Sequence, residues 1–252
     1  MEKLTPEECL ILADIIGDTP TTLNVLDCLK QGMCRAYVFG NLPDITASLV
    51  IDTLYDDAFC FATDVDALWH LLEFQTDLES LNINVDPIYA ETLGQHISAK
   101  TDSSVKYYVE IHQALLEPAR SYSNEIVRLL TLADVELLAN APAGVRINSY
   151  QTPQRTITTG PVAAVIVNDS IVSIAHTYAC SDLHGGISVS TLEEWRGKGY
   201  ATSAASLVAQ QIQAMGKVPV WSCGEENIAS LRTAQKLGFT EVSRRIDIVA
   251  TS

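Results

Sequence analysis

The sequence predicts a protein of mixed α+β or α/β class, in which a mostly antiparallel sheet flanked by helices follows an N-terminal α/β domain. Helix-start signals alternate with short runs rich in β-branched residues along the chain. A polar, proline-containing segment at 118–124 breaks this pattern, so we place the domains at 1–120 and 121–252. A glycine-containing turn between a strand and a helix marks the second domain.

The predicted elements of the first domain begin with two helices. Thr5 and Thr19 are each followed by proline, which fits an N-cap and the first helical position. Gly17 and Gly32 end these helices. The elements that follow are three strands over 35–39, 47–52 and 58–62 in an antiparallel meander, a helix over 63–74 capped by Thr63, a strand over 81–85, a helix from Pro87, and a strand over 105–115.

The second domain begins with a predicted strand over 126–130 and a helix over 132–139. Two apolar runs, 160–167 and 170–178, are separated by Asn168-Asp169, which predicts a hairpin. The remaining elements are a strand over 187–191, an amphipathic helix from Ala201 to Gly216, a strand over 218–223, and a helix capped by Asn227 and ended by Gly238. Inspection of the sequence shows no internal repeat.

The turn over 196–201 is suited to holding an anion. Gly197 and Gly199 permit backbone conformations closed to other residues and allow a ligand to approach the main chain. The helix that follows presents free N–H groups and the positive end of its dipole. Arg196 and Lys198 add two cationic donors. A diphosphate is the ligand that this combination favours.

The glycine turn has three other interpretations. A Rossmann turn would require glycine or alanine at Thr202 and normally opens a domain, whereas this turn lies near the end of the chain. A P-loop would require Gly-Lys followed by Ser or Thr after a second glycine, and no such run exists. An ordinary strand-to-helix turn is the third interpretation, and a lone Gly-x-Gly would favour it. The downstream motif favours a ligand site instead.

Two stretches carry a resemblance to a known family: an Arg-x-x-Gly-x-Ala turn and a helix that ends in Gly-Phe. These stretches, 196–201 and 227–239, resemble the acyl-CoA-binding core of the GNAT superfamily of N-acetyltransferases. The run over 221–230 is similar to a two-domain subgroup. The motifs lie in the last half of the chain. The element order of the first domain resembles a degenerate GNAT half that lacks a Gly-x-Gly turn.

The resemblance implies a cofactor site and no metal. In the family, a backbone N–H of the strand before the turn meets the thioester carbonyl, which here implies Val189 and Ser190. Asn227, with Ser230 in the same helix turn, matches the position beside the pantetheine arm. The implied pyrophosphate contacts are Arg196, Gly197, Lys198, Gly199, Tyr200 and Ala201.

The acid and the base of the implied reaction are left open. Many GNAT enzymes place a tyrosine four residues before the Gly-Phe pair, where this chain has Ala234. Thiolate departure would then be unassisted, or be aided by a water or by a residue such as Tyr178 or Ser230. His176 has an imidazole suited to act as a base, and Glu226, next to Glu225, is a second candidate. Each also has a purely structural interpretation, as a hydrogen-bonded strand residue or as a complement to the helix dipole.

Composition excludes several classes of function. The net charge of −15 is concentrated in residues 1–120, with 20 acidic and 6 basic side chains, which argues against nucleic-acid binding. This acidity indicates a solvated surface or long-range attraction of a cationic amine. No apolar stretch reaches membrane-spanning length and no signal peptide is evident, so we expect a cytoplasmic protein. The six cysteines lack zinc-like spacing, so we expect free buried thiols.

The resemblance implies an N-acyltransferase that transfers acetyl from acetyl-CoA to a primary amine of a small molecule or peptide. Two alternatives stay open: a non-catalytic acyl-CoA-binding sensor or scaffold, and an amino-acid N-acyltransferase that uses a longer acyl-CoA. The acceptor itself is not predicted, because the acceptor site in such folds is built from variable loops and often from the partner domain or subunit. Homodimers are frequent in the superfamily, and the sequence adds nothing further on assembly.

Overall fold

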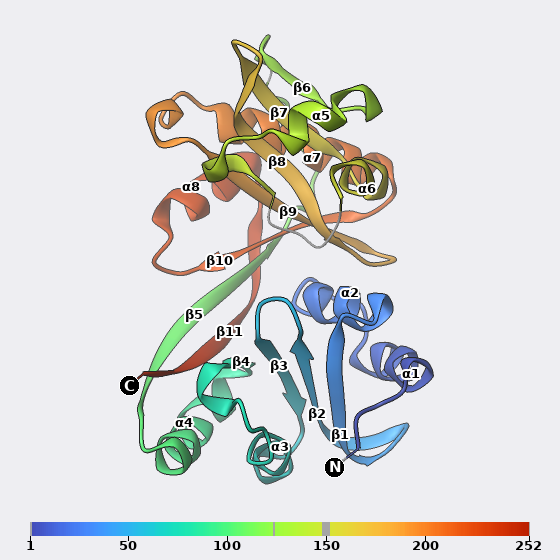
Figure 1. Cartoon of the computed structure of the whole chain (residues 1–252), viewed down its shortest axis with the longest axis vertical. Helices are drawn as coiled ribbons and strands as arrows, with labels where there is room; N and C mark the ends of the chain where they lie inside the picture. Colours follow the sequence, from blue (N-terminus) through green and yellow to red (C-terminus); the bar gives the residue numbers. More distant parts are fainter. Residues whose placement is uncertain (1, 123, 148–151, 252) are drawn as a thin grey trace. The chain divides into compact units, whose positions relative to one another are not determined.

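The computed structural model of the chain describes residues 2–122, 124–147 and 152–251 (Figure 1). It divides into two compact units. The N-terminal unit comprises Met1–His112, Gly224–Glu226 and Ser243–Ser252, and the C-terminal unit comprises Gln113–Cys223 and Asn227–Val242. The chain therefore returns to the N-terminal unit at its end. The linear domain division at residue 120 stays a prediction.

The N-terminal unit has the strand order β1-β2-β3-β4-β11-β5. Strands β1, β2 and β3 form an antiparallel meander, β3 pairs with β4 in parallel, and β11 is antiparallel to β4. The elements are α1 (Pro6–Ile16), α2 (Leu23–Gln31), β1 (Cys34–Asn41), β2 (Asp44–Asp52), β3 (Asp57–Ala62), α3 (Val65–Leu72), the short 3-10 helix η1 (Leu78–Ser80), β4 (Asn82–Val85), α4 (Pro87–Thr101), β5 (Ser104–Ala114) and β11 (Thr240–Thr251).

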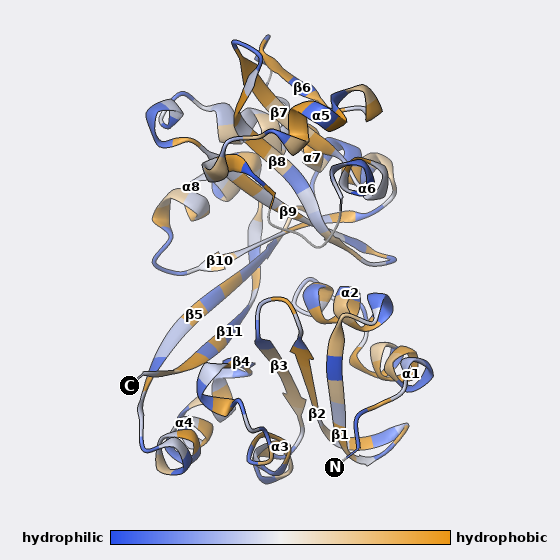
Figure 2. Ribbon diagram, viewed as in Figure 1, coloured by the Kyte–Doolittle hydropathy of each residue, from blue (hydrophilic) through white to orange (hydrophobic). Residues whose placement is uncertain are grey.

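Two hydrophobic clusters hold helices against the sheet of this unit. Helices α3 and α4 contribute Leu68, Leu71 and Leu93 to one cluster, together with inward residues of β2, β3 and β4. Helices α1 and α2 pack in a second cluster with residues of β1, β2 and β3. Figure 2 shows β2 and β3 coloured as predominantly hydrophobic strands. Burial from both sides explains that composition.

The C-terminal unit has the strand order β5-β10-β9-β8-β7-β6. Strands β6 to β9 pair antiparallel in sequence, and β9 pairs with β10 in parallel. The elements are β6 (Val127–Leu129), η2 (Leu132–Asp134), α5 (Val135–Ala139), η3 (Ala143–Val145), α6 (Pro153–Thr159), β7 (Val162–Val167), β8 (Ser170–Cys180), β9 (His184–Thr191), η4 (Glu193–Trp195), α7 (Tyr200–Ala214), β10 (Val218–Gly224) and α8 (Ile228–Leu237).

Helices cover both faces of this sheet as well. Helices α7 and α8 supply Ala204, Val208 and Leu237 to a cluster that includes Ala175 and Ile187 of the sheet. The small residues of α7 let it lie close to the strands. The opposite face packs against α5, η3 and α6 through a separate cluster. The two faces of β8 and β9 therefore meet different helices.

The two halves of the chain repeat one layout. Each half has a three-stranded meander, a helix, a strand parallel to the third strand, a second helix and a final strand: β1-β2-β3-α3-β4-α4-β5 and β7-β8-β9-α7-β10-α8-β11. The final strand of the second half, β11, lies mostly in the N-terminal unit. In the strand order, β11 lies between β4 and β5, and β5 lies between β10 and β11. The fold is thus a mixed, mostly antiparallel α/β architecture, which confirms the predicted class.

Several predicted boundaries need correction. Asp64, not Thr63, caps α3, because its carboxylate accepts hydrogen bonds from the N–H groups of Asp66 and Ala67. Helix α2 begins at Leu23, since Thr19 and Thr22 bond to each other in a turn before it. Helix α6 and strand β11 were not predicted at all. The hairpin is confirmed: Asn168 and Asp169 have φ of 49° and 59°.

Candidate active site

The glycine turn follows β9 and η4 and leads directly into α7. Gly197 and Gly199 have φ of +78° and +80°, so both occupy the left-handed region that favours glycine. Apart from the residues adjacent in the chain, no heavy atom of the described residues lies within 4 Å of the position that a Cβ would take at either glycine. The space beside the backbone is therefore open to a ligand. The arrangement agrees with the strand, turn and helix that the sequence predicts.

The N-terminus of α7 is not capped by a side chain, a feature that it shares with α2. Gly199 is its N-cap residue, no side chain caps it, and its first turn holds no acidic residue. By contrast, Asp64, Asp86 and Asn227 cap α3, α4 and α8 through their side chains. The first N–H groups of a helix need partners from outside it. At α7 they face the open turn, together with the positive end of the helix dipole.

Two exposed cationic side chains flank the turn. Lys198 holds its Nζ 4.2 Å from the centre of the Trp195 ring, which orients the ammonium group. Arg196 donates from Nε to the carbonyl oxygen of Thr191 at 3.3 Å. Tyr200 lies with its ring centre 6.2 Å from that of Trp195. The turn thus combines free N–H groups, a helix dipole and two positive charges, as an anion site requires.

Strands β9 and β10 diverge toward the turn and form a fork. Their parallel pairing comprises three residue pairs and ends at Gly186 with Val220, although β9 continues to Thr191 and β10 to Gly224. Past Gly186, the edge of β9 that faces β10 has no ladder partner among the described residues. The open edge leads from the end of the pairing toward the glycine turn.

The backbone N–H of Val189 points into this fork. Leu192 donates its N–H to the carbonyl oxygen of Val172 on β8, at 3.0 Å. Because alternate residues of a strand direct their N–H groups to the same edge, Ser190 also points to β8 and Val189 points to the opposite edge. The carbonyl oxygen of Ser190 accepts from Ser173 Oγ at 3.2 Å, which fits this assignment. Of the two predicted residues, Val189 has the donor on the open side.

His176 lies on the sheet face opposite α7. It pairs with Ser188 across the antiparallel β8–β9 ladder, and directly opposed residues share a face. The neighbouring pair, Ala175 with Val189, points to the α7 side. The Nδ1 atom of His176 is buried and has no hydrogen-bond partner among the described residues. Burial lowers the pKa of His176 from 6.5 to about 4, so the imidazole is neutral at pH 7.

Tyr178 sits in a β-bulge beside the end of the fork. The ladder shifts register between Thr177 and Ala179, which leaves Tyr178 as the extra residue of β8. A Cβ built on Gly186 would lie 2.5 Å from Cζ of Tyr178, so the ring packs directly on that glycine. Gly186 ends the β9–β10 pairing. The structure therefore places the Tyr178 ring at the base of the fork, on the same face as His176.

The other predicted residues lie around the start of α8. The Asn227 carboxamide caps α8 by accepting from the N–H of Ser230 at 3.1 Å, and Ser230 Oγ accepts from Trp221 Nε1 at 2.9 Å. Ser230 therefore joins α8 to β10, and Asn227 fixes the start of α8. Glu225 and Glu226 lie in the turn before Asn227, not in the first turn of the helix as expected. Both belong to the N-terminal unit, and Glu225 pairs with Arg244 at 2.7 Å.

Ala234, at the position of the family's tyrosine, is completely buried. It packs in the cluster that holds α8 against the sheet, near Trp221 and Phe239, whose rings meet edge to face. This position has no exposure through which a side chain could reach a ligand. Sequence reasoning overlooked one feature of the site, the Gly185-Gly186 pair, although paired glycines within a strand are a signal of close approach.

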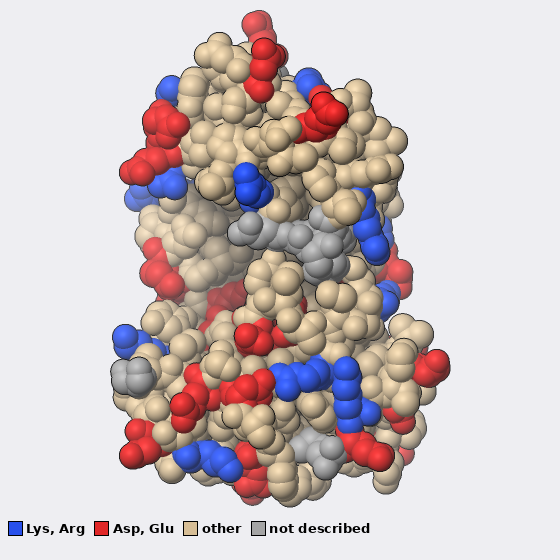
Figure 3. Space-filling view, in the orientation of Figure 1, with Lys and Arg blue, Asp and Glu red and all other residues tan. Residues whose placement is uncertain are grey.

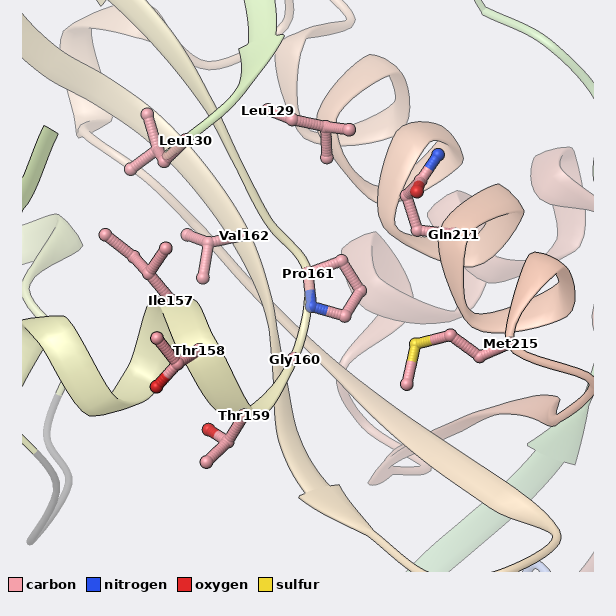
Figure 4. Close-up of a pocket in the computed structure, with 10 residues that line it drawn as sticks. All are labelled: Leu129, Leu130, Ile157, Thr158, Thr159, Gly160, Pro161, Val162, Gln211 and Met215. Carbon is pink, nitrogen blue, oxygen red and sulfur yellow. The ribbon is translucent and has the colours of Figure 1, made fainter. Parts of the chain in front are cut away.

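A cavity of about 260 Å³ lies at the other end of α7 (Figure 4). Thr159, Gly160 and Pro161 line it at the start of β7, and Gln211 and Met215 line it from the last turn of α7. It is therefore separate from the glycine turn at the start of the helix. Its lining combines apolar side chains with polar groups, and none of the lining side chains is ionisable. It has none of the features that an anion site needs.

Among the residues that the structure describes, no group of three or more His, Cys, Asp or Glu side chains is placed to hold a metal ion. No helix in the described ranges is both long and apolar enough to span a membrane. All six cysteines are free thiols, four of them buried. Figure 3 shows acidic side chains interspersed with basic ones on the face that it presents.

Comparison with known families decides the assignment. A model of the GNAT acetyltransferase family matches residues 18–244, which is most of the chain. The chain belongs to the GNAT acetyltransferase family. This GNAT protein is accordingly an enzyme of the N-acetyltransferase class, and the family generally uses an acyl-CoA. The glycine turn, the uncapped α7 and the fork provide a fitting place for such a cosubstrate. No match is found among curated proteins.

Solved structures of the same fold resemble this GNAT protein over its whole length. A GCN5-related N-acetyltransferase-like protein from Streptococcus suis is 18% identical, with TM-score 0.67, and the match covers 97% of this chain and 99% of that one. A Drosophila protein is 12% identical, with TM-score 0.75 and coverage of 99% and 98%. A tandem GNAT protein from the clavulanic acid biosynthesis pathway is 9% identical, with TM-score 0.59 and coverage of 98% and 97%. At these identities the likeness concerns the fold.

Proposed function

We propose that this GNAT enzyme transfers an acetyl group from acetyl-CoA to a primary amine of a small molecule or peptide in the cytoplasm. The observation that carries the proposal is the uncapped N-terminus of α7 behind two glycines with positive φ. This arrangement leaves backbone donors free where a diphosphate can reach them. The six free cysteines fit a reducing compartment.

The pyrophosphate would bind across the turn. Gly197 and Gly199 allow the diphosphate oxygens to approach the main chain, because no atom lies within 4 Å of either missing Cβ. The N–H groups of Tyr200 and Ala201 would donate to those oxygens. Arg196 and Lys198 would supply positive charge, with Lys198 held in place by Trp195. Charge-assisted contacts of this kind strengthen binding and fix the orientation of the ligand.

The thioester would then reach the fork between β9 and β10. The N–H of Val189 is directed to the open edge of β9, where it can donate to the thioester carbonyl oxygen. As the amine nitrogen attacks the carbonyl carbon, negative charge develops on that oxygen, and a fixed donor stabilises it. Collapse of the tetrahedral intermediate breaks the C–S bond, and the thiolate leaves and takes up a proton. The products are an amide and free CoA.

Proton transfers would be handled on the sheet face opposite α7. His176 is neutral at pH 7 and can accept a proton, but its lowered pKa makes it a weak base. Tyr178 carries a hydroxyl at the base of the fork and is the better-placed candidate for the acid, because Ala234 is buried and has no proton to donate.

The net charge of −15 would attract a cationic amine from a distance.

Calorimetric titration with acetyl-CoA tests the proposal. Gly199→Glu places a carboxylate where the pyrophosphate would bind, and we expect it to weaken binding by more than roughly tenfold, which corresponds to about 1.4 kcal/mol. Gly216→Glu is the matched control, because Gly216 follows α7 at its other end with φ +75° and no atom within 4 Å of its Cβ position. Equal loss of binding in the two variants would refute a site at the turn.

Release of free thiol with a panel of amines tests the chemistry. An enzyme releases thiol from acetyl-CoA in proportion to a productive amine. Tight binding without amine-dependent release would assign the protein to the non-catalytic alternative, a sensor or scaffold. Tighter binding of a longer acyl-CoA would favour a different donor. Absence of binding to the folded wild type would contradict the proposal altogether.

A further inference from the structure

The N-terminal unit contains a second fork with the same geometry. Strands β3 and β4 pair in parallel over three residue pairs, and the pairing ends at Phe59 with Asn84. Strand β3 continues to Ala62 and leads into α3, as β9 leads into α7. A chain that repeats the acyltransferase layout therefore has two places where strands part in front of a helix N-terminus.

The second fork is filled by a buried arginine. Arg245, on β11, donates from Nη2 to the carbonyl oxygen of Cys60 on β3 at 2.6 Å and to that of Asn84 on β4 at 2.9 Å. Its Nε donates to the side-chain oxygen of Asn84. The guanidinium carbon also lies 4.7 Å from the centre of the Phe61 ring. Arg245 thus bridges the two strands where their ladder ends.

Burial makes this contact hard to displace. Arg245 is only 5% exposed. Removal of the Arg245 side chain from the fork would leave the carbonyl groups of Cys60 and Asn84 without these hydrogen-bond partners. The guanidinium is always charged, so it needs such partners where it is buried. The adjacent carboxyl groups of Glu110 and Asp247 both bond to the Asn84 amide, at 3.0 and 2.7 Å, and add negative charge near the guanidinium. The contacts form a fixed network rather than a loose surface pair.

The anion site in front of the second fork is also missing. The Asp64 carboxylate accepts from the N–H groups of Asp66 and Ala67 at the start of α3, at 3.4 and 3.2 Å. It therefore occupies donors that a phosphate would use, and together with Asp66 it places negative charge there. Neither glycine nor a basic residue lies between β3 and α3. The protein's own side chains therefore occupy both the fork and the helix N-terminus, which are the two parts that a cofactor site would need.

We propose that Arg245 and Asp64 hold the N-terminal unit as a closed copy of the acyltransferase fold, so that each chain binds one acyl-CoA, at the C-terminal unit. The inference rests on the proposed function for the location of that one site. Arg245 serves as an internal substitute for a ligand in the fork of β3 and β4.

Binding stoichiometry is the first test, with acetyl-CoA as the probe. We expect one acetyl-CoA per chain for the wild type, none for Gly199→Glu, and one for Thr63→Glu, which places the same carboxylate on an exposed residue of the β3–α3 turn. Two per chain, with each variant losing one, would overturn the inference and leave the proposed function intact. If the wild type binds one acetyl-CoA and only Thr63→Glu abolishes this binding, both the inference and the proposed function are overturned.

Exchange of the arginine Nε–H with water tests the filled fork without any ligand. In ¹⁵N-labelled protein, the Arg245 signal is assigned by its loss in Arg245→Lys, and that of the exposed Arg244 by its loss in Arg244→Lys. We expect Arg245 to exchange roughly 100-fold or more slowly than Arg244, since exchange requires opening of the buried network. Similar rates for the two arginines would overturn the inference, even if the wild type binds no acetyl-CoA and the proposed function fails.

Discussion

The buried His176 should make the C-terminal unit sensitive to acid. Its folded-state pKa of about 4 lies below the ordinary value of 6.5, because burial disfavours the charged imidazolium. As the pH falls below 6.5, the unfolded chain takes up a proton that the folded chain does not. The contribution of His176 to stability is therefore lost between pH 6.5 and pH 4, and this contribution changes no further below that range.

The size of the effect follows from the two pKa values. Their full difference corresponds to about 3 kcal/mol, of which about 2 kcal/mol would be lost by pH 5. His176 is partly accessible to solvent, although its Nδ1 atom is buried, so we expect a measured loss of about 1–2 kcal/mol. A chain of this size would then melt roughly 2–8 °C lower for that reason alone.

Denaturant unfolding at pH 7 and pH 5 is the appropriate assay. The fluorescence of Trp221 reports on the C-terminal unit, where its ring is buried. His176→Gln keeps a polar side chain of similar size and removes the titration, so its free energy of unfolding should change less between the two pH values than that of the wild type. An identical change in both proteins would refute the assignment of the lowered pKa to His176.

The remaining predictions concern four other positions. Asp247 has its pKa raised to about 6 by burial, so the folded chain gains stability as the pH falls from 6 to 3.8, and Asp247→Asn should lose this gain in the same unfolding assay. Asp134→Asn should cost about 1–2 kcal/mol in urea unfolding at pH 7, because Asp134 pairs with Arg128 through two hydrogen bonds and completes a capping box. The deficit should shrink as the pH falls below 3.8, because the Arg128 guanidinium holds the pKa of Asp134 well below that ordinary value. Ala234→Tyr should lower stability by about 1–3 kcal/mol without increasing turnover, measured by melting and thiol release, and faster turnover would contradict our account of the acid. Gly186→Ala should cost a similar amount and slow thiol release, since the new Cβ would displace the Tyr178 ring; an unchanged rate would exclude Tyr178.

Local signals predicted most of the elements and the backbone of the glycine turn, whereas anion binding at that turn stays a prediction. Asn168-Asp169 forms the hairpin because both residues tolerate left-handed backbone conformations. Gly197 and Gly199 adopt positive φ because glycine has no Cβ that would clash with the backbone there. The choice of Asp64 over Thr63 as a cap depends on a one-residue difference in backbone geometry, which sequence patterns resolve poorly. Helix α6 was overlooked although Thr152-Pro153 repeats the signal seen at Thr5.

Contacts distant in sequence could not be predicted. Strand β11 has an alternating apolar pattern at Ile246 and Ile248, but nothing local assigns it a place beside β4. Arg245 bonds to residues 161 and 185 positions away in the chain. The bulge that turns Tyr178 onto Gly186 likewise depends on the register of two strands. A histidine such as His176 is recognised from sequence, but its low pKa is set by burial in the folded unit.

The two forks show how one layout can yield a structural unit and a candidate active site. Parting strands leave backbone groups without ladder partners, and buried groups of that kind must find other partners. In the N-terminal unit, Arg245 and Asp64 provide them. In the C-terminal unit, no described side chain caps the first N–H groups of α7, and glycines keep the approach to them open. The difference between the units therefore lies in a few side chains at the ends of strands, and we propose that the unit with the uncapped helix is the one that binds the ligand.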